Sequence, residues 1–188
     1  QNSKEIVRTM LFAKSFGEVL EMNANMRYIQ HLLQDSLDDN LEWKQDVPKC
    51  HPLKKVCATV DSIISKADQS QTFNFNEKFE LLTKPPYGFY SNFANMAMMA
   101  FAMRPWVKKI FDMQGKPRDE IGMVDDIDLL FKVWDEKKKE SGKLNFKFQT
   151  PEEGKLCREI TSLFSLEPRS KEYGDISSLT NAKYVMVN

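Results

Sequence analysis

The feature that most constrains this chain is the run FANMAMMAFAM at positions 93–103, which is apolar almost all the way round a helix. A surface helix keeps one polar face, whereas a helix without such a face must be covered on most sides by other segments. Ser91 or Asn92 precedes the run, and either side chain can cap its N-terminus by accepting a backbone hydrogen bond. We therefore predict that residues 93–103 form the most deeply buried helix of the protein.

The composition of the chain allows such a helix to be covered. Its 188 residues are 41% hydrophobic and include 13 Phe and 3 Trp, enough to bury the core of one domain or two small ones. The 27 basic and 27 acidic side chains cancel, so the net charge does not indicate nucleic acid or an anionic membrane as a partner. Only a local patch of charge could still indicate one.

Three cysteines, at positions 50, 57 and 157, are an odd number in a chain that is long enough to fold without disulfides. They indicate free thiols in a reducing compartment, so we expect a cytoplasmic location. No run of about 18 apolar residues is present, and no charged region precedes an apolar stretch at the N-terminus, so neither a membrane span nor a signal peptide is predicted. Because the first residue is Gln1 rather than Met, the sequence is consistent with a processed product or an excised piece of a longer protein.

The N-terminal region has apolar residues at steps of three and four, which predicts a helix over residues 3–38. Unbroken, it would be about 54 Å long at about 1.5 Å per residue, so we expect a break near Asn23 and Asn25 or a partner elsewhere. One interpretation is a two-helix hairpin that packs on its own domain. The other is an amphipathic arm that binds a partner protein or a second copy of the chain, with an interaction face of Met22, Met26, Ile29 and Leu33.

A second amphipathic helix is predicted from Leu53 to about Lys66, and the polar segment ADQSQT follows it. We place a domain boundary there. Residues 1–70 are predicted to form the helical arm or hairpin, and residues 71–188 the second domain.

Two segments of the second domain have the pattern of a strand. Phe73 and Phe75 alternate with polar residues, and so do Leu144, Phe146 and Phe148. They predict a short two-stranded sheet. Between them, residues 106–111 are predicted to finish a helix before a turn at Gly115, and Met123 to Trp134 form the apolar face of another helix. The segment TPEE at 150–153 is a capping box that opens a further helix.

The tetrapeptide Pro85, Pro86, Tyr87 and Gly88 is predicted to be a structural turn. Pro85 disfavours helical geometry at the residue before it, Pro86 removes a second backbone donor, and Gly88 allows a left-handed backbone. The same letters occur in amino-methyltransferases, in which an Asp or Asn before Pro-Pro-Tyr accepts a hydrogen bond from the target amine. Here the preceding residue is Lys84, which can only donate, and no glycine-rich loop for a methyl donor is present.

No catalytic, cofactor-binding or metal-binding residue is assigned. Cys50, His51 and Cys57 lack the paired spacing of a metal site, and His31 lies on another predicted helix. Neither histidine lies in a nucleophile motif, and no P-loop is present. We therefore expect no cofactor.

Residues 72–165 follow the order strand, short helix, buried helix, turn, helix, strand, helix, which is compatible with a winged-helix-like module. A DNA-binding function would use a basic patch of Lys108, Lys109, Lys116 and Arg118. Three aspartates, Asp125, Asp126 and Asp128, lie near the N-terminus of the helix that would enter the groove, and they oppose docking on phosphates. These aspartates are explained by the helix dipole, although they also leave an enzyme with a carboxylate site as a second alternative.

The PPYG tetrapeptide, the buried helix after it, the GKP turn and the next helix resemble a segment of some large P-loop ATPases of bacterial phage-defence systems. In those proteins, including the phage-exclusion type, the segment lies downstream of the ATPase core. The resemblance covers roughly residues 79–165 and rests on Pro85, Pro86, Tyr87, Gly88 and Gly115. It implies an auxiliary domain of a larger defence protein and carries over no catalytic residue, since the nucleotide-binding motifs are absent from this chain.

Together these observations predict a mainly α fold with a minor β component, in which a helical arm precedes a winged-helix-like α+β module. The predicted function is a noncatalytic assembly or regulatory interaction module of a larger bacterial protein. Its partner would be another protein, the remainder of a longer polypeptide or a second copy. DNA binding and carboxylate catalysis remain the alternatives.

Overall fold

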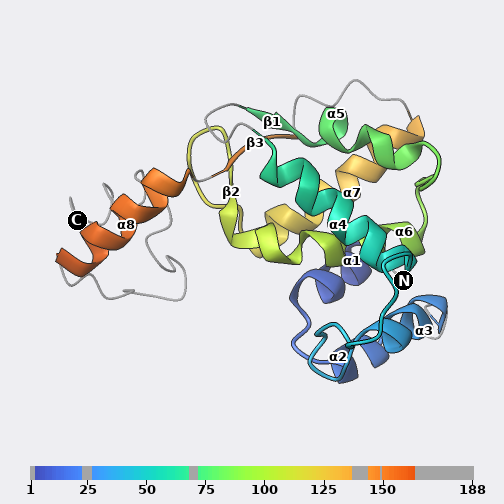
Figure 1. Cartoon of the computed structure of the whole chain (residues 1–188). Helices are drawn as coiled ribbons and strands as arrows, with labels where there is room; N and C mark the ends of the chain where they lie inside the picture. Colours follow the sequence, from blue (N-terminus) through green and yellow to red (C-terminus); the bar gives the residue numbers. More distant parts are fainter. Residues whose placement is uncertain (1–2, 23–26, 68–71, 137–143, 149, 164–188) are drawn as a thin grey trace.

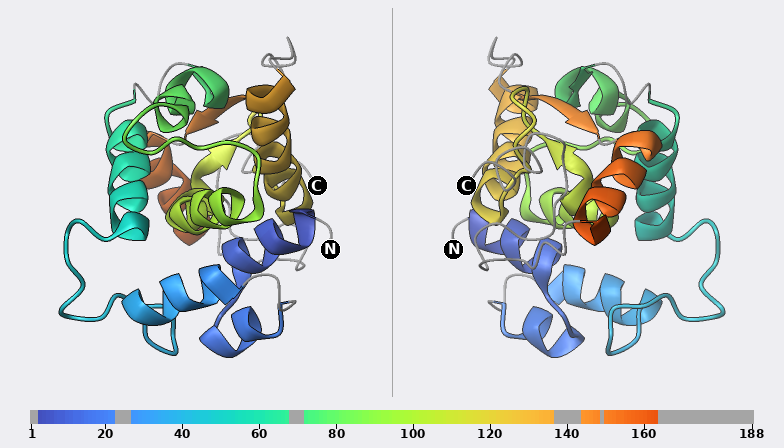
Figure 2. Two further views of the ribbon diagram at one scale, coloured as in Figure 1. Left: turned by 90° about the vertical axis from the view of Figure 1, so that its right-hand side faces the viewer. Right: turned by 90° about the vertical axis from the view of Figure 1, so that its left-hand side faces the viewer.

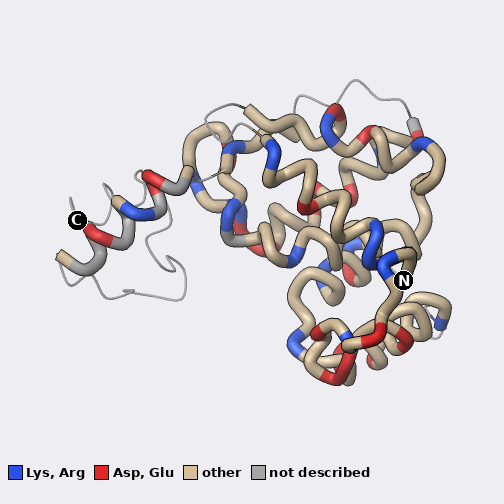
Figure 3. The backbone as a smooth tube through the Cα atoms, in the orientation of Figure 1, with Lys and Arg blue, Asp and Glu red and all other residues tan. Residues whose placement is uncertain are grey.

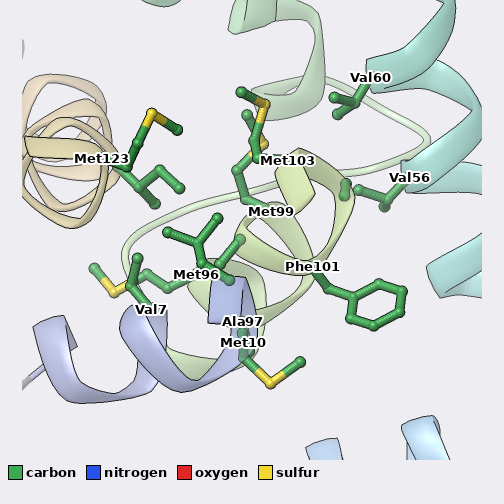
Figure 4. Packing of buried hydrophobic residues seen from close by; sticks show 14 of the residues in the cluster. Val7, Met10, Val56, Val60, Met96, Ala97, Met99, Phe101, Met103 and Met123 are labelled. Carbon is green, nitrogen blue, oxygen red and sulfur yellow. The ribbon is translucent and has the colours of Figure 1, made fainter. Parts of the chain in front are cut away.

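Helix α6, Phe93–Met103, lies at the centre of the protein, as its apolar sequence predicts (Figure 2). In this computed structural model eight of its residues are buried, and Met99 and Met103 are completely enclosed. Figure 4 shows the α6 methionines among side chains from several neighbouring helices. Asn92 caps the helix by accepting a 2.8 Å hydrogen bond from the backbone N–H of Asn95, which confirms one of the two predicted caps.

The described part of the chain is mainly helical with a small antiparallel sheet, which confirms the predicted fold class (Figure 1). The structure describes residues 3–22, 27–67, 72–136, 144–148 and 150–163. The remaining helices are α1 (Ser3–Phe12), α2 (Phe16–Leu20), α3 (Arg27–Ser36), α4 (Pro52–Ser65), α5 (Phe75–Phe79), α7 (Glu120–Glu136) and α8 (Pro151–Leu163), with the 3-10 helices η2 (Glu80–Thr83) and η3 (Arg104–Lys109). Among the described helices, none combines the length and the apolar character that crossing a membrane requires.

The prediction of helix over residues 3–38 is correct only in part, because a break that the apolar spacing did not predict separates α1 from α2. Arg104 of η3 donates hydrogen bonds to the carbonyls of Met10 at 3.0 Å and Ala13 at 2.7 Å. A continuous helix would use these carbonyls as acceptors for its own next turn. The long-range arginine therefore stabilises the end of α1. The break predicted near residues 23–25 lies outside the described residues.

Helices from both sides of residue 70 build one hydrophobic core around α6. Helix α1 packs on α6 and α7, and α4 packs on another side of α6. In Figure 4, Val7 and Met10 approach from α1, and Val56 and Val60 approach from α4. The first helices therefore lie against the second predicted domain rather than projecting away from it.

The sheet has three strands rather than the predicted two, in the order β1-β3-β2. Strands β1 (Phe73–Asn74) and β3 (Asn145–Phe148) fall within the predicted segments and pair antiparallel, although Phe75 begins helix α5. The third strand, β2 (Ile110–Phe111), was predicted to end a helix. It pairs with β3 on the other edge of the sheet. After β2 the chain turns back at Gly115, whose φ is +79°, as the glycine predicted, and this turn brings Pro117 opposite Phe111.

Phenylalanine side chains hold these very short strands in place. Phe75 of α5 packs against Phe146 of β3 with tilted rings whose centroids are 4.4 Å apart, and Phe73 meets Phe148 edge to face at 5.1 Å. Isolated ladders of two residues are marginal in water, so the buried aromatic contacts supply most of the stabilisation. The alternating phenylalanines thus define both the strands and their attachment to the helical body.

The PPYG tetrapeptide is a turn, as predicted. Helix η2 ends at Thr83, Lys84 is extended, and Gly88 adopts a left-handed φ of +65°. The Tyr87 ring packs on the core, and its hydroxyl lies 2.6 Å from the hydroxyl of Thr59 on α4. The turn therefore connects the segment before α6 to α4.

Helix α8 begins with the predicted capping box. The Thr150 hydroxyl accepts from the N–H of Glu153 at 3.2 Å, and the Glu153 carboxylate accepts from the N–H of Thr150 at 3.0 Å. Figure 1 shows α8 beyond the sheet, away from the other helices.

Candidate functional site

A pocket of about 410 Å³ lies between the loop that follows α3, helix α4 and the junction of α6 with η3. Its volume falls in the range of sites that hold small ligands or inserted side chains. We call it the Trp43 pocket. Its lining includes three aromatic side chains and four charged ones, namely Trp43, Phe101, Trp106, Glu42, Lys54, Asp61 and Arg104.

The loop after α3 positions Trp43 by folding back on itself. Trp43 forms an antiparallel bridge with Leu37, and the Asp38 carboxylate accepts two backbone N–H bonds from within the loop. Leu41 adopts a left-handed φ of 61°, a conformation that costs a non-glycine residue about 1–2 kcal/mol. Its side chain is buried in the core, and this burial offsets the backbone strain.

The three aromatic side chains differ in exposure. Phe101 and Trp106 are buried, whereas Trp43 keeps 37% of its surface exposed. The rings of Trp43 and Phe101 meet edge to face with centroids 6.2 Å apart. The pocket therefore has an apolar floor and one aromatic side chain that a ligand can contact.

The two basic side chains of the pocket are bound to the protein itself. Lys54 donates to the carbonyl of Val47 at 3.0 Å, and its ammonium lies 5.6 Å from the centre of the Trp43 ring. Arg104 donates to the end of α1 as described, and its guanidinium lies 5.4 Å from the centre of the Phe101 ring. Burial lowers the pKa of Arg104, and the carboxylates of Glu18 and Glu42 partly offset this effect.

The two acidic side chains of the pocket are less engaged. Within the ranges that the structure describes, neither the Glu42 nor the Asp61 carboxylate forms a hydrogen bond or an ion pair. Both residues are exposed. The pocket therefore offers carboxylate acceptors together with basic groups that already have partners.

Cys57 lines the pocket but is not activated as a nucleophile. Burial raises the pKa of its thiol to about 12, so it is protonated at neutral pH, and a thiolate is the reactive form. Cys50 is exposed and lies before α4. Among the described residues, no group of three His, Cys, Asp or Glu side chains is placed to hold a metal ion.

The predicted interaction face on the N-terminal region is not a surface in this structure. Met22, Ile29 and Leu33 are between 1% and 6% exposed and belong to the protein's own core. Met26 lies outside the described residues. Because α2 and α3 fold back on the body, the apolar spacing that suggested a partner is satisfied internally.

The structure does not gather the predicted basic patch into four available cations. Arg118 forms a two-bond ion pair with the buried carboxylate of Asp126, at 2.7 and 2.8 Å. The Lys109 ammonium lies 4.8 Å from the centre of the Trp106 ring, and Lys116 is exposed. The side chain of Lys108 is outside the described part. Figure 3 shows basic and acidic positions mixed along the upper part of the backbone, whereas acidic positions gather around α2 and α3.

The three aspartates of α7 form specific pairs and do not act mainly on the helix dipole. The helix begins at Glu120, so these residues lie beyond its first turn, where the dipole effect fades. Asp125 pairs with Lys4 at 2.8 Å, and Asp128 accepts from Lys132 at 2.6 Å and from the hydroxyl of Ser3 at 2.7 Å. Asp125 and Asp128 therefore connect α7 to α1, and Asp126 connects α7 to Arg118 in the segment that precedes this helix.

The pKa values of the two buried aspartates move in opposite directions. Burial, together with the nearby carboxylates of Asp125 and Asp119, raises the pKa of Asp126, although the Arg118 guanidinium lowers it. Burial also opposes ionisation of Asp128, but Lys132, Ser3 and Lys4 outweigh it and lower the pKa of that carboxyl. Both groups are used as partners in the structure, so they do not form the open carboxylate pair that the enzyme alternative needs.

The residues of the Trp43 pocket were not identified from the sequence. Trp43 lies in a polar loop, EWKQDVP, where a single exposed tryptophan is the one available signal. Phe101 belongs to an apolar run that indicates only burial. Lys54, Cys57 and Asp61 follow helical spacing on α4, but no local rule connects that face with residues 41–43 or with residues 101–106.

Comparisons with protein-family models, curated proteins and solved structures give no significant match to this chain. The resemblance to phage-defence ATPases and the winged-helix-like arrangement therefore stay predictions.

Proposed function

We propose that this protein is a noncatalytic interaction module, which binds a segment of a partner polypeptide at the Trp43 pocket and acts in assembly or regulation. The observation that supports this most is the pocket itself, in which a partly exposed Trp43 lies beside the buried rings of Phe101 and Trp106. Tryptophan is enriched among the residues that dominate binding energy in protein interfaces.

The chemical state of the surrounding groups favours binding over catalysis. The Cys57 thiol is protonated, and Lys54 and Arg104 donate to backbone carbonyls. A catalytic group needs a pKa near the working pH and free access to the reacting atom. The pocket side chains named here do not combine these properties.

The size and composition of the pocket suit an inserted side chain. A volume of about 410 Å³ is at the lower end of ligand sites, and its aromatic lining can cover an alkyl or aromatic group. The charged rim can then select among partners, because electrostatic complementarity contributes mainly to specificity.

We propose further that the module belongs to a larger bacterial protein, and the resemblance of its PPYG region to phage-defence ATPases supports this assignment. On this proposal the partner segment comes from the remainder of that polypeptide or from another subunit in the cytoplasm. A second copy of the chain is a third source.

The test is a selection of peptides from a random display library on the whole chain. We expect enriched peptides that bind the native protein and lose at least about tenfold in affinity on Trp43→Ala, because removing a central aromatic contact typically costs 1–2 kcal/mol or more. Tyr28→Ala is the matched control, because Tyr28 is a more exposed aromatic on α3. Peptides that tolerate Trp43→Ala, or a library without enrichment, would contradict the proposal.

A further inference from the structure

We infer that the Trp43 pocket receives the side chain of a lysine or arginine from the partner segment. The alkyl stem would lie on the aromatic wall, and the cationic head would lie at Glu42 and Asp61. This inference rests on the proposed function, since it names the class of side chain that the same pocket selects.

The unpaired carboxylates are the first observation. Glu42 and Asp61 both line the pocket, and over the described ranges neither carboxylate has a hydrogen-bond or ion-pair partner. A guanidinium or ammonium group supplies the donors that a carboxylate lacks. A cationic ligand can therefore bind these carboxylates without breaking a hydrogen bond or an ion pair, although Glu42 also acts through space on Arg104, whose pKa it raises.

The basic groups of the pocket are held elsewhere, which argues against an anionic ligand. An anion would have to draw Lys54 from the Val47 carbonyl, or Arg104 from the carbonyls of Met10 and Ala13. The second change would leave the end of α1 without its donors, and unpaired backbone acceptors in a part-buried site are costly. A cationic side chain requires neither change.

The rings of Trp43 and Phe101 can bind the alkyl stem of a lysine or arginine better than its charged head. The ammonium of Lys54 already lies over Trp43, and the guanidinium of Arg104 lies over Phe101. A second cation over the same rings would meet like charge. Long basic side chains bury their methylene groups along apolar surface and keep the head polar, so the rings bind the stem and the carboxylates bind the head.

The test uses three small probes of similar chain length and different charge: n-butylammonium, n-butanol and pentanoate. Each is titrated into the whole protein, and binding is followed by the indole N–H signals of Trp43 and Trp106 in a proton–nitrogen correlation spectrum. We expect n-butylammonium to bind most tightly. We expect Glu42→Gln and Asp61→Asn each to weaken it about two- to fivefold, the range of exposed charge pairs. Asp35→Asn, at an exposed position outside the pocket, is the matched control.

Three outcomes would overturn the inference. If n-butanol binds as tightly as n-butylammonium and both are lost on Trp43→Ala, the pocket is an apolar docking site, and the proposed function survives without the cation. If pentanoate binds most tightly, Lys54 or Arg104 selects the ligand instead. If no probe shifts either indole signal at concentrations that saturate such weak sites, the inference fails, and the peptide selection decides separately whether the proposed function fails too.

Discussion

Replacing Arg118 by alanine tests whether the aspartates of α7 are structural. The Arg118 guanidinium binds both oxygens of Asp126, whose side chain is 6% exposed, and it also approaches the carbonyl of Gly122 at 3.4 Å. Gly122 leaves room for this approach, since a Cβ there would lie 2.9 Å from the Arg118 Cζ atom. Arg118→Ala removes the cation and leaves the carboxylate buried.

The expected loss of unfolding free energy is about 3–5 kcal/mol near pH 7, the usual effect of leaving one partner of a buried ion pair alone. Arg118 is 28% exposed on its side chain, so it can be solvated when its partner is lost. Asp126→Asn should therefore cost less than Arg118→Ala. The double variant Arg118→Met with Asp126→Leu should be more stable than Arg118→Ala, because it leaves no charge in the site.

The effect should depend on pH in a defined direction. Burial raises the folded pKa of Asp126 above its unfolded value, so the folded state binds more protons between the two values and loses stability as pH rises through that interval. Arg118→Ala removes the cation that lowers this pKa, and the interval extends upward. The difference between the native protein and the variant should thus be largest near pH 7 and shrink as the pH falls toward the acid range.

Urea unfolding followed by circular dichroism, at several pH values and with common m-values, measures these differences. Lys84→Ala is the control. It removes the cation of an exposed pair with Glu80, and we expect a loss below about 1 kcal/mol. An Arg118→Ala loss as small as that of Lys84→Ala, or a loss that grows on acidification, would refute the argument that Asp126 depends on its partner.

Four further predictions concern a hydrogen bond, a buried side chain, a thiol and the basic patch. Tyr87→Phe should cost about 0.5–1.5 kcal/mol in urea unfolding, because it breaks the hydrogen bond to Thr59, and little further loss should appear when Thr59→Val is added. Met99→Ala should cost about 2–5 kcal/mol in the same assay, since it leaves a cavity in the centre of the core. Alkylation by iodoacetamide near neutral pH should modify Cys57 more than about a hundredfold slower than the exposed Cys50, measured by mass spectrometry; comparable rates would show that the thiol is not protected. Duplex and single-stranded oligonucleotides should show no steeply salt-dependent binding by fluorescence anisotropy, because the basic patch includes a paired Arg118, and such binding would restore the DNA alternative.

The sequence determined the features that depend on near neighbours. The apolar run at 93–103, the Asn92 cap, the Thr150 capping box and the turn at Gly88 were all predicted, and all are present. Each involves a contact within a few residues or a conformation of one residue, so local spacing is sufficient. The alternating phenylalanines identified β1 and β3 for the same reason.

Local spacing failed where a distant group decided the outcome. The predicted N-terminal helical region breaks after α1. There the carbonyls of Met10 and Ala13 accept hydrogen bonds from Arg104, which lies almost a hundred positions further along the chain. Residues 110–111 became a strand because β3 offered them an edge. Periodicity records which side chains are apolar and contains no information on which partner covers them.

The candidate site depends wholly on contacts between distant parts of the chain. Trp43, Lys54 and Phe101 lie on a loop and two helices, and only the packing of α4 on α6 brings them to one pocket. The same packing shifts the pKa values of Cys57 and Arg104, since burial is the largest cause of both shifts. The sequence alone determined a buried helix and its N-terminal cap, whereas the tertiary structure decided which charged side chains found partners, because pairing depends on distances that only the folded chain defines.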